Sequence, residues 1–292
     1  MTDLRFGLNV PTSAGKGADP VAAAKRAEEL GFDFVSSNDH LHGTSPNHET
    51  WTMLSWMAAA TSRIHVASRV LATPYRHPAV LAKMAETFDR LSGGRLILGL
   101  GGGYSDEEFR AFGLGERSPR DKVDGMEESI RIIRGLWSEP GFSFEGRMYR
   151  TRGAELTPKP DRRIPIWLGT YGPRALAVTG RLADGWIPTY ELALPEQVTG
   201  MRDRVLKAAS DAGRDPEEIT CVYNLDIRIE ENADVAPFVI AGSAEQLGER
   251  LAGFAELGFT AFNFCPAGPD LDEQAERLAT EVIPAVRASI GG

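Results

Sequence analysis

Strand-like apolar runs alternate with helix-like segments along nearly the whole chain, and this alternation constrains the fold more than any other feature. A strand over residues 4–10 precedes a helix from Asp19-Pro20 to Gly31, and the same unit recurs about eight times. Such alternation is typical of a parallel sheet covered by helices. Because 292 residues hold these units without a linker or internal repeat, a closed TIM (β/α)8 barrel is favoured over a doubly wound open sheet.

The other elements are predicted within one domain that covers residues 1–292. Apolar runs predict strands over residues 32–37, 63–71, 95–100, 164–168, 185–189, 219–227 and 259–264. Helical periodicity and capping patterns predict a helix that begins at Pro173 and further helices over 49–60, 78–91, 122–137, 195–212, 243–257 and 271–289. A small hairpin over 142–150 is expected inside an insertion of about 140–163.

Composition limits the classes of partner and the compartment. The net charge of -9 argues against nucleic acid or an anionic membrane as the main partner. Cys221 and Cys265 lie far apart in apolar runs, which is typical of buried thiols in a reducing compartment. The first residues lead directly into a strand, and no apolar run reaches transmembrane length, so we expect a cytoplasmic protein.

The strand over 164–168 leads into a turn whose residues are typical of a phosphate-binding site. Gly169-Thr170-Tyr171-Gly172 forms the turn, Pro173 takes the first helical position, and Arg174 follows. A helix N-terminus reached through glycines exposes unpaired N–H groups and the positive end of the helix dipole, which favour an anion. The alternative is an ordinary strand-to-helix turn.

Asn38-Asp39-His40 follows the second strand, at the end of the barrel where active sites lie. An imidazole titrates near neutral pH, so His40 is a candidate for moving a proton, and a loop histidine without a role is the alternative. His40 and His42 also have the spacing of metal ligands. No histidine follows residue 77, so the second half of the barrel supplies no imidazole and we expect no metal site.

The fourth strand runs into Gly101-Gly102-Gly103, followed by Tyr104. The dinucleotide pattern G-x-G-x-x-G fails here, and Ser105 with Glu108 has the spacing of a capping box. Glycines allow the backbone to approach a flat ring, whereas a bare turn is the alternative. Arg69 lies in the otherwise apolar third strand, where its charge requires a partner or polar ligand unless it points outward under a helix.

Together these segments resemble the bacterial luciferase-like monooxygenase superfamily, especially its coenzyme F420-dependent (deazaflavin) oxidoreductases. The resemblance rests on Asn38-Asp39-His40, residues 69–78, LAKMAETFDRLSGGRLILGLGGGY, GRMYR…LTPKP and IPIWLGTYGPRAL…ADGW. It implies a TIM-like barrel with the ring across the strand ends and a cis peptide bond at Arg69–Val70 behind the ring. The implied cofactor-binding residues are Asp39, His40, Arg69, Val70, Gly101, Gly102, Gly103, Gly169, Thr170, Tyr171, Gly172 and Arg174.

The resemblance implies an F420-dependent oxidoreductase that transfers hydride between the coenzyme and a small organic substrate, with His40 as proton donor. An FMN-dependent monooxygenase with a separate flavin reductase is the alternative, and a non-catalytic flavin-binding barrel is the second. Arg174 and the glycine-rich fourth strand favour a cofactor with a long anionic tail. The superfamily's sugar-phosphate dehydrogenases have a glutamate where this chain has Tyr104, which argues against glucose 6-phosphate. Tyr75, Tyr104 and Tyr190 are candidate substrate contacts, and a homodimer is expected.

Overall fold

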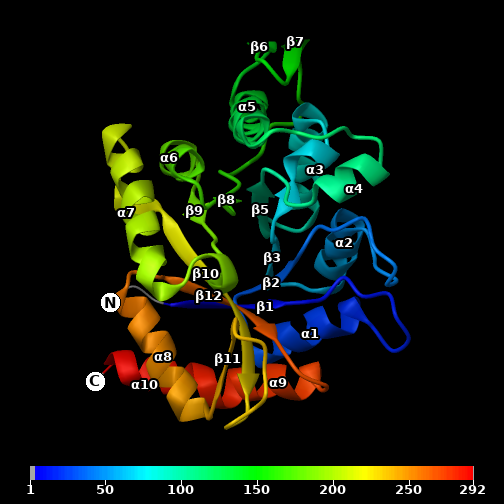
Figure 1. The fold of residues 1–292 in the computed structure, drawn as a ribbon. Coiled ribbons are helices and arrows are strands. Elements are labelled where there is room, and N and C mark those ends of the chain that lie inside the picture. Colours follow the sequence, from blue (N-terminus) through cyan, green and yellow to red (C-terminus); the bar gives the residue numbers. More distant parts are fainter. Residues whose placement is uncertain (1–3, 292) are drawn as a thin grey trace.

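The computed structural model describes residues 4–291, and its parallel strands close into an eight-stranded barrel (Figure 1). Neighbouring strands around the barrel are β1, β2, β3 with β4, β5, β8, β9, β10 and β12, and the pairing of β9 with β10 completes the ring. The predicted TIM barrel is therefore confirmed. The barrel strands are β1 (Arg5–Asn9), β2 (Phe34–Ser37), β3 (His65–Ser68), β4 (Leu71–Ala72), β5 (Leu96–Gly101), β8 (Ile166–Leu168), β9 (Gly185–Trp186), β10 (Thr220–Ile229) and β12 (Ala261–Pro266).

Helices follow the strands and surround the barrel in chain order (Figure 1). Proline at the first position or a side-chain cap marks most of their starts, which is why the sequence placed them well. The helices are α1 (Pro20–Leu30), α2 (Thr50–Ala60), α3 (Pro78–Leu91), α4 (Asp106–Ala111), α5 (Pro119–Ser138), α6 (Pro173–Leu182), α7 (Pro195–Asp211), α8 (Ala244–Glu256), α9 (Leu271–Arg277) and α10 (Ile283–Gly291).

A layer of inward-facing side chains fills the barrel interior. Phe34 and Trp167 meet edge to face with ring centroids 5.4 Å apart, and aliphatic side chains from the other strands complete the layer. The outward-facing side chains of the same strands join a second, larger core under the helices. With its interior filled, the barrel presents its open space at the carboxyl ends of the strands.

Several elements differ from the sequence predictions. The third strand is interrupted between β3 and β4, where the Arg69–Val70 peptide bond is cis, as the resemblance predicted. The hairpin comprises β6 (Phe142–Glu145) and β7 (Arg150–Ala154), so its second strand extends beyond the predicted end at residue 150. The last helix is interrupted by a π-helical turn over Leu278–Val282. The Ser105–Glu108 spacing indicated the start of α4 but not its extent, and strand β11 (Val239–Gly242) was not predicted, because both elements are short and lack a long apolar pattern.

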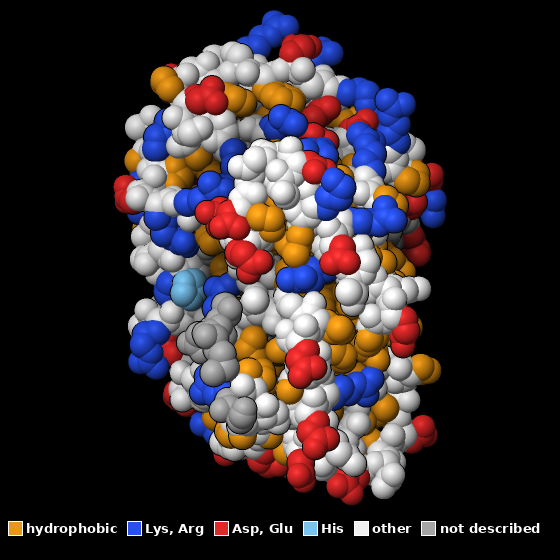
Figure 2. Space-filling view, turned by 90° about the vertical axis from the view of Figure 1, so that its left-hand side faces the viewer, with side chains coloured by type: hydrophobic (Ala, Val, Ile, Leu, Met, Phe, Trp, Pro, Cys, Tyr) orange, Lys and Arg blue, Asp and Glu red, His pale blue; other side chains and the backbone are white. Residues whose placement is uncertain are grey.

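The surface carries charges of both signs. On the α7 side of the molecule, basic and acidic side chains are intermixed rather than separated into large patches (Figure 2). Across residues 4–291, every helix falls short of the length and apolarity that crossing a membrane requires.

A carboxylate on α1 fixes the start of β3. The Glu28 side chain accepts hydrogen bonds from the backbone N–H groups of Ser62 (2.9 Å), Arg63 (2.7 Å) and Ile64 (2.9 Å). Burial acts to raise the pKa of Glu28, but these hydrogen bonds outweigh it and lower the pKa to about 2. The ionised carboxylate therefore stabilises the connection between α2 and β3.

Replacing Glu28 by Gln should lower the free energy of unfolding at neutral pH by about 1–2 kcal/mol. A carboxyl whose pKa is depressed on folding stabilises above its unfolded pKa and loses that effect as the pH falls. The difference between wild type and Glu28→Gln in urea unfolding should therefore shrink to less than half near pH 3. Glu29→Gln, one residue along and exposed, is the control. An equal difference at both pH values would contradict this account.

Candidate active site

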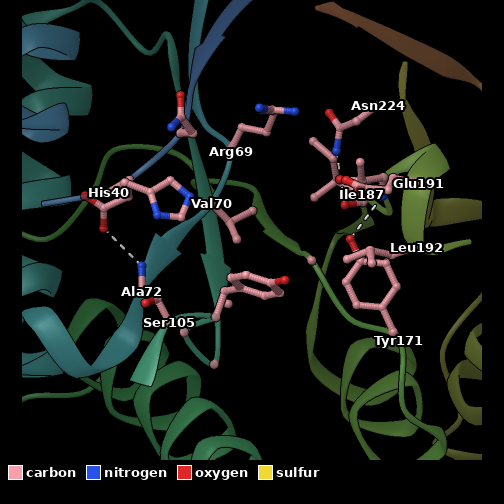
Figure 3. Close-up of a pocket in the computed structure, with 18 of the residues that line it drawn as sticks. His40, Arg69, Val70, Ala72, Ser105, Tyr171, Ile187, Glu191, Leu192 and Asn224 are labelled. Carbon is pink, nitrogen blue, oxygen red and sulfur yellow. Dashed lines mark hydrogen bonds between the residues drawn. The ribbon is translucent and has the colours of Figure 1, made fainter. Parts of the chain in front are cut away.

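A cavity of about 520 Å³ opens at the carboxyl ends of the barrel strands (Figure 3). Its walls come from the segments that follow β2, β3, β5, β8, β9 and β10, so residues far apart in sequence share one space. The lining includes many of the residues predicted from the sequence, namely Asp39, His40, Arg69, Val70, Tyr75, Gly101, Gly102, Gly103, Tyr104, Gly169 and Tyr171.

The imidazole of His40 extends into the cavity (Figure 3). A carboxylate holds it in this position. Its Nδ1 lies 2.8 Å from Oε1 of the buried Glu108. A carboxylate accepts hydrogen bonds, so Nδ1 carries the proton and Nε2 is left to exchange one. The Tyr75 hydroxyl donates to the other carboxylate oxygen, Oε2. Burial and then the hydrogen bond to Glu108 raise the pKa of Tyr75, so this hydroxyl stays protonated.

Glu108 is the most consequential of the site residues that sequence reasoning missed, and the others include Ile187, Glu191, Asn224 and Asp226. Its spacing from Ser105 indicated a capping box, and the Ser105 hydroxyl does accept a hydrogen bond from the Glu108 backbone N–H at 3.2 Å. The Glu108 side chain does not complete that box, because it contacts His40 instead. Besides that spacing, the sequence offered only the acidic run over residues 106–108, which follows the glycines of the fourth strand after Tyr104 and Ser105.

Asp39 lines the cavity, and its carboxylate is taken up in contacts that position the site. Its carboxylate accepts from the backbone N–H of Ala72 at 3.0 Å and from both terminal nitrogens of Arg76, at 2.8 and 3.1 Å. Arg76 also pairs with Glu49, the N-cap of α2. The end of β2 is thereby tied to β4 and α2, which fixes the backbone that carries His40.

Val70 and the strand-end glycines form one wall of the cavity. A Cβ atom at Gly101 would lie 2.7 Å from Cγ2 of Val70, and one at Gly169 would lie 3.2 Å from the same atom. Gly103 has a φ of 89°, and a Cβ there would lie 2.2 Å from the ring of Phe109. The glycines are therefore required by contacts within the protein, as well as presenting backbone to the cavity.

The predicted phosphate turn lies at the edge of this cavity. Thr170 is buried and its hydroxyl is bonded to that of Thr179 at 2.7 Å, so Thr170 holds the turn instead of lining the cavity. Tyr171 lines the cavity and accepts a hydrogen bond from the Thr189 N–H at 3.1 Å. Gly172 is the N-cap of α6, and no side chain caps that N-terminus. Its N–H groups are therefore available to an anion.

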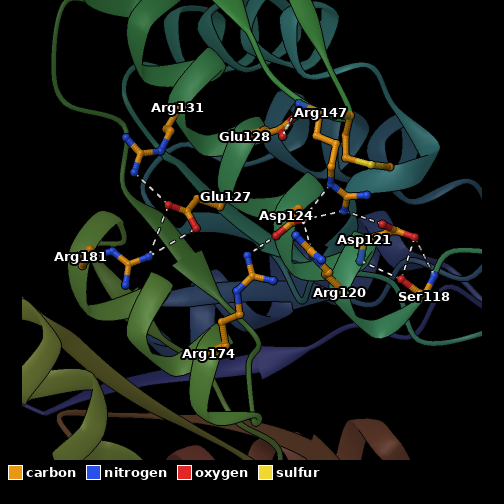
Figure 4. Close-up of polar contacts among 11 residues, drawn as sticks. Ser118, Arg120, Asp121, Asp124, Glu127, Glu128, Arg131, Arg147, Arg174 and Arg181 are labelled. Atoms are coloured by element: carbon orange, nitrogen blue, oxygen red, sulfur yellow. Dashed lines mark hydrogen bonds and ion pairs between the residues drawn. The ribbon is translucent and has the colours of Figure 1, made fainter.

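Arg174 does not point into the cavity. Its guanidinium pairs with Asp124 on α5, which also accepts from Arg147 (Figure 4). The hydrogen bond from Arg174 holds the pKa of Asp124 below its usual value. The positive charge expected to contact an anion is thus offset by a carboxylate, a partner that the local sequence did not reveal.

The three predicted substrate tyrosines have different surroundings. Tyr104 is 82% exposed at the cavity rim, and Tyr75 lines the cavity with its hydroxyl bonded to Glu108. Tyr190 lies outside the cavity lining, because its ring packs against Tyr223 and its hydroxyl accepts from Arg250 at 2.7 Å. We therefore remove Tyr190 from the candidate substrate contacts.

The geometry agrees with the comparison of the sequence to known families. Residues 4–237 match the family model of luciferase-like monooxygenases. The chain belongs to this family. The resemblance predicted from the sequence is confirmed, and the match includes His40, Val70, Gly101 and Gly169.

Similar proteins of this fold include enzymes named for coenzyme F420. The F420-dependent glucose-6-phosphate dehydrogenase of Microbacterium testaceum is 26% identical over 97% of this chain and 98% of its own. The enzyme of the same name from Kineococcus radiotolerans is 28% identical over 94% and 93%. An F420-dependent secondary alcohol dehydrogenase, solved with an F420-acetone adduct, superposes with a TM-score of 0.87 at 21% identity, covering 98% of this chain and 99% of its own.

Within this luciferase-like chain, residues 4–291 contain no group of three or more His, Cys, Asp or Glu side chains placed to hold a metal ion. His40 and His42, which have the spacing of metal ligands, instead lie against Glu108 and Glu107 respectively.

Replacing Glu108 by Ala should change the tautomer of His40. In the wild type we expect neutral His40 to carry its proton on Nδ1, because the carboxylate accepts there. Without that acceptor the proton should redistribute to Nε2, which ¹⁵N NMR of the imidazole would detect. Glu107→Ala, at the exposed neighbouring position that contacts His42, should leave the His40 signal unchanged. A wild-type His40 protonated on Nε2 would refute the assigned geometry.

Proposed function

We propose that this chain is a coenzyme F420-dependent oxidoreductase that transfers hydride between the deazaflavin and a small organic substrate. The observation that carries the proposal is the cavity at the strand ends, in which the His40–Glu108 pair faces the wall built around Val70. Relatives aligned over nearly their whole length are named as F420-dependent dehydrogenases, which supports the same coenzyme here.

The residues present suit an anionic flavin-type cofactor. The N-terminus of α6 lacks a side-chain cap and adjoins the cavity through Gly169 and Tyr171, which makes it a seat for the cofactor phosphate. Val70 and the backbone at Gly101 would lie behind the ring. When bound, the coenzyme supplies the site that accepts or donates the hydride.

His40 moves the proton that accompanies hydride transfer. Oxidation of an alcohol releases a hydroxyl proton, and reduction of a carbonyl takes one up, so the same imidazole serves either direction. Glu108 orients the ring through Nδ1 and leaves Nε2 toward the cavity. Tyr75 fixes Glu108 in turn, so the three side chains form a chain of hydrogen bonds that ends at the reacting group.

Replacing His40 by Ala should slow single-turnover hydride transfer by about 100-fold or more, since proton transfer typically contributes that much. The coenzyme dissociation constant, measured by deazaflavin fluorescence, should change little. His40→Asn keeps a hydrogen-bond donor to Glu108 but has no group that carries a proton to the substrate. If His40 is the proton carrier, this variant should slow hydride transfer as much as His40→Ala does. His42→Ala is the matched control. Loss of coenzyme affinity without loss of rate would show that His40 only holds the coenzyme.

Binding of the two cofactors separates the proposal from its main alternative. Micromolar affinity for F420 supports the proposed reaction, whereas micromolar affinity for FMN with none for F420 would indicate the FMN-dependent monooxygenase and a flavin reductase partner. Binding of F420 without turnover of any alcohol, carbonyl or sugar phosphate would favour the non-catalytic barrel.

We further propose a homodimer formed through α2 and α3. Helix α2 has the sequence TWTMLSWMAAA and is apolar on all its faces, which is typical of a helix buried on every side. Trp56 on α2 is nevertheless 68% exposed, and Val80 and Leu91 on α3 are 58% and 83% exposed. A groove of about 440 Å³ with a mainly apolar lining lies between the two helices, and a second copy of this face would cover it.

Replacing Leu91 by Glu should raise the dimer dissociation constant about 30-fold or more, the effect of losing a central interface contact. Analytical ultracentrifugation of wild type and variant measures it. Leu271→Glu, on α9 away from this face, should leave the association unchanged. A monomeric wild type, or equal association of the two variants, would contradict the dimer.

The cysteines support a cytoplasmic location, which we propose on chemical grounds. Cys221 and Cys265 are both free and buried. Free thiols persist in a reducing compartment.

A further inference from the structure

Arg69 places a cation at the cavity without giving it a partner of opposite charge. The residue lies between β3 and β4, where its backbone N–H donates to the Ser37 carbonyl at 2.8 Å. Its side chain extends away from Val70 and across the mouth of the barrel, on the side of Asn224 (Figure 3). The side chain therefore reaches from the third strand toward β10 and β12, which are on the opposite side of the barrel.

The guanidinium of Arg69 has few polar contacts. Among residues 4–291, no carboxylate oxygen lies within 4.0 Å of its nitrogens. Its one side-chain hydrogen bond runs from Nη1 to the sulfur of Cys265 at 3.2 Å, and its buried Nε has no partner. Burial raises the pKa of the Cys265 thiol to about 11, so this acceptor is neutral and weak. Nearby Arg76, in contrast, pairs with Asp39 and Glu49.

Asp226 is an acidic residue whose charge interacts with that of Arg69, but it makes no direct contact with the guanidinium. Asp226 lies beside Cys265 in the pairing of β10 with β12, and it lines the same cavity. Burial raises the pKa of Asp226, and the charge of Arg69 acts in the opposite direction without bringing the two groups to ion-pair distance. Glu191 also lines the cavity. Arg69 is half-buried and its buried Nε lacks a partner, so a bound anion would supply the paired charge that the protein does not.

We infer that Arg69 receives a carboxylate or phosphate carried by the small-molecule substrate. This inference rests on the proposed function, because it assigns the coenzyme phosphate to the other anion position, the α6 N-terminus after β8. Strand β9 separates β8 from β10, so the two positions are on different parts of the rim. A planar guanidinium suits either oxyanion, since it can donate two parallel hydrogen bonds.

The test uses acetate and inorganic phosphate as probes on protein saturated with coenzyme, so that the α6 position is occupied. Binding is followed by deazaflavin fluorescence and by the melting temperature. Arg69→Met, which keeps the volume without the charge, should weaken acetate and phosphate binding about 10- to 100-fold. Arg69→Lys should retain part of the affinity. Asp226→Asn should strengthen binding, because it removes a like charge from beside the anion.

A second measurement separates ligand binding from a structural role. Without added anions, Arg69→Met should melt at the same or a higher temperature than wild type, because the substitution removes a charge that lacks a partner. A clear fall in melting temperature would indicate that Arg69 supports the fold instead.

Two further outcomes are decisive. If Arg69→Met weakens coenzyme binding but leaves acetate and phosphate binding unchanged, Arg69 serves the coenzyme and the inference is wrong. If the wild type binds no deazaflavin, the proposed function fails, but comparing wild type with Arg69→Met in coenzyme-free protein still tests the anion position. Equal acetate affinity of these two proteins would overturn it.

Discussion

Closure of the parallel sheet by the pairing of β9 with β10 is the constraint on which the cavity depends. All the strands point the same way, so closure gathers their carboxyl ends into one rim. The interior layer around Phe34 and Trp167 fills the space below, which leaves the rim as the place where side chains remain free. For this reason one cavity is lined by residues that are far apart in the sequence, such as His40, Val70, Gly169 and Asn224.

Within that rim, most polar side chains position other groups and few are left free. Asp39 is saturated by Ala72 and Arg76, and Glu108 is shared between His40 and Tyr75. These contacts fix the backbone and the imidazole before any ligand arrives. Preorganisation of this kind lowers the reorganisation that a reaction requires, because the donors and acceptors are already oriented.

The sequence predicted the barrel well because long periodic helices and buried strands are local signals. Helix α3 begins and ends at the predicted residues, where a proline opens a helix with a clear apolar face. Short elements carry a weaker signal, and for α4, with the sequence DEEFRA, only the start was indicated, by the capping spacing of Ser105 and Glu108. The sequence of the turn after β9 likewise did not indicate where its side chains point. In the structure, the ring of Tyr190 packs against that of Tyr223.

Partners of charged side chains were the least predictable part of the site. Glu108 has the spacing of a capping residue, and its choice of His40 depends on a contact across 68 positions. The ion pair of Arg174 with Asp124 spans 50 positions. Such contacts are set by how helices pack on the barrel, which a local pattern does not encode. Arg69 was the exception, because a charge inside an apolar strand already indicated an unusual environment.

The position of the Arg69 charge also determines how close an anionic ligand must come before the protein attracts it. A net charge of -9 repels anions on approach, and at physiological salt that repulsion fades within about 8 Å of the surface. The attraction of a single guanidinium at the mouth of the barrel is similarly short-ranged. An anion therefore gains nothing from the protein's field until it has entered the mouth, so selection takes place after entry and through fit, and long-range steering contributes little.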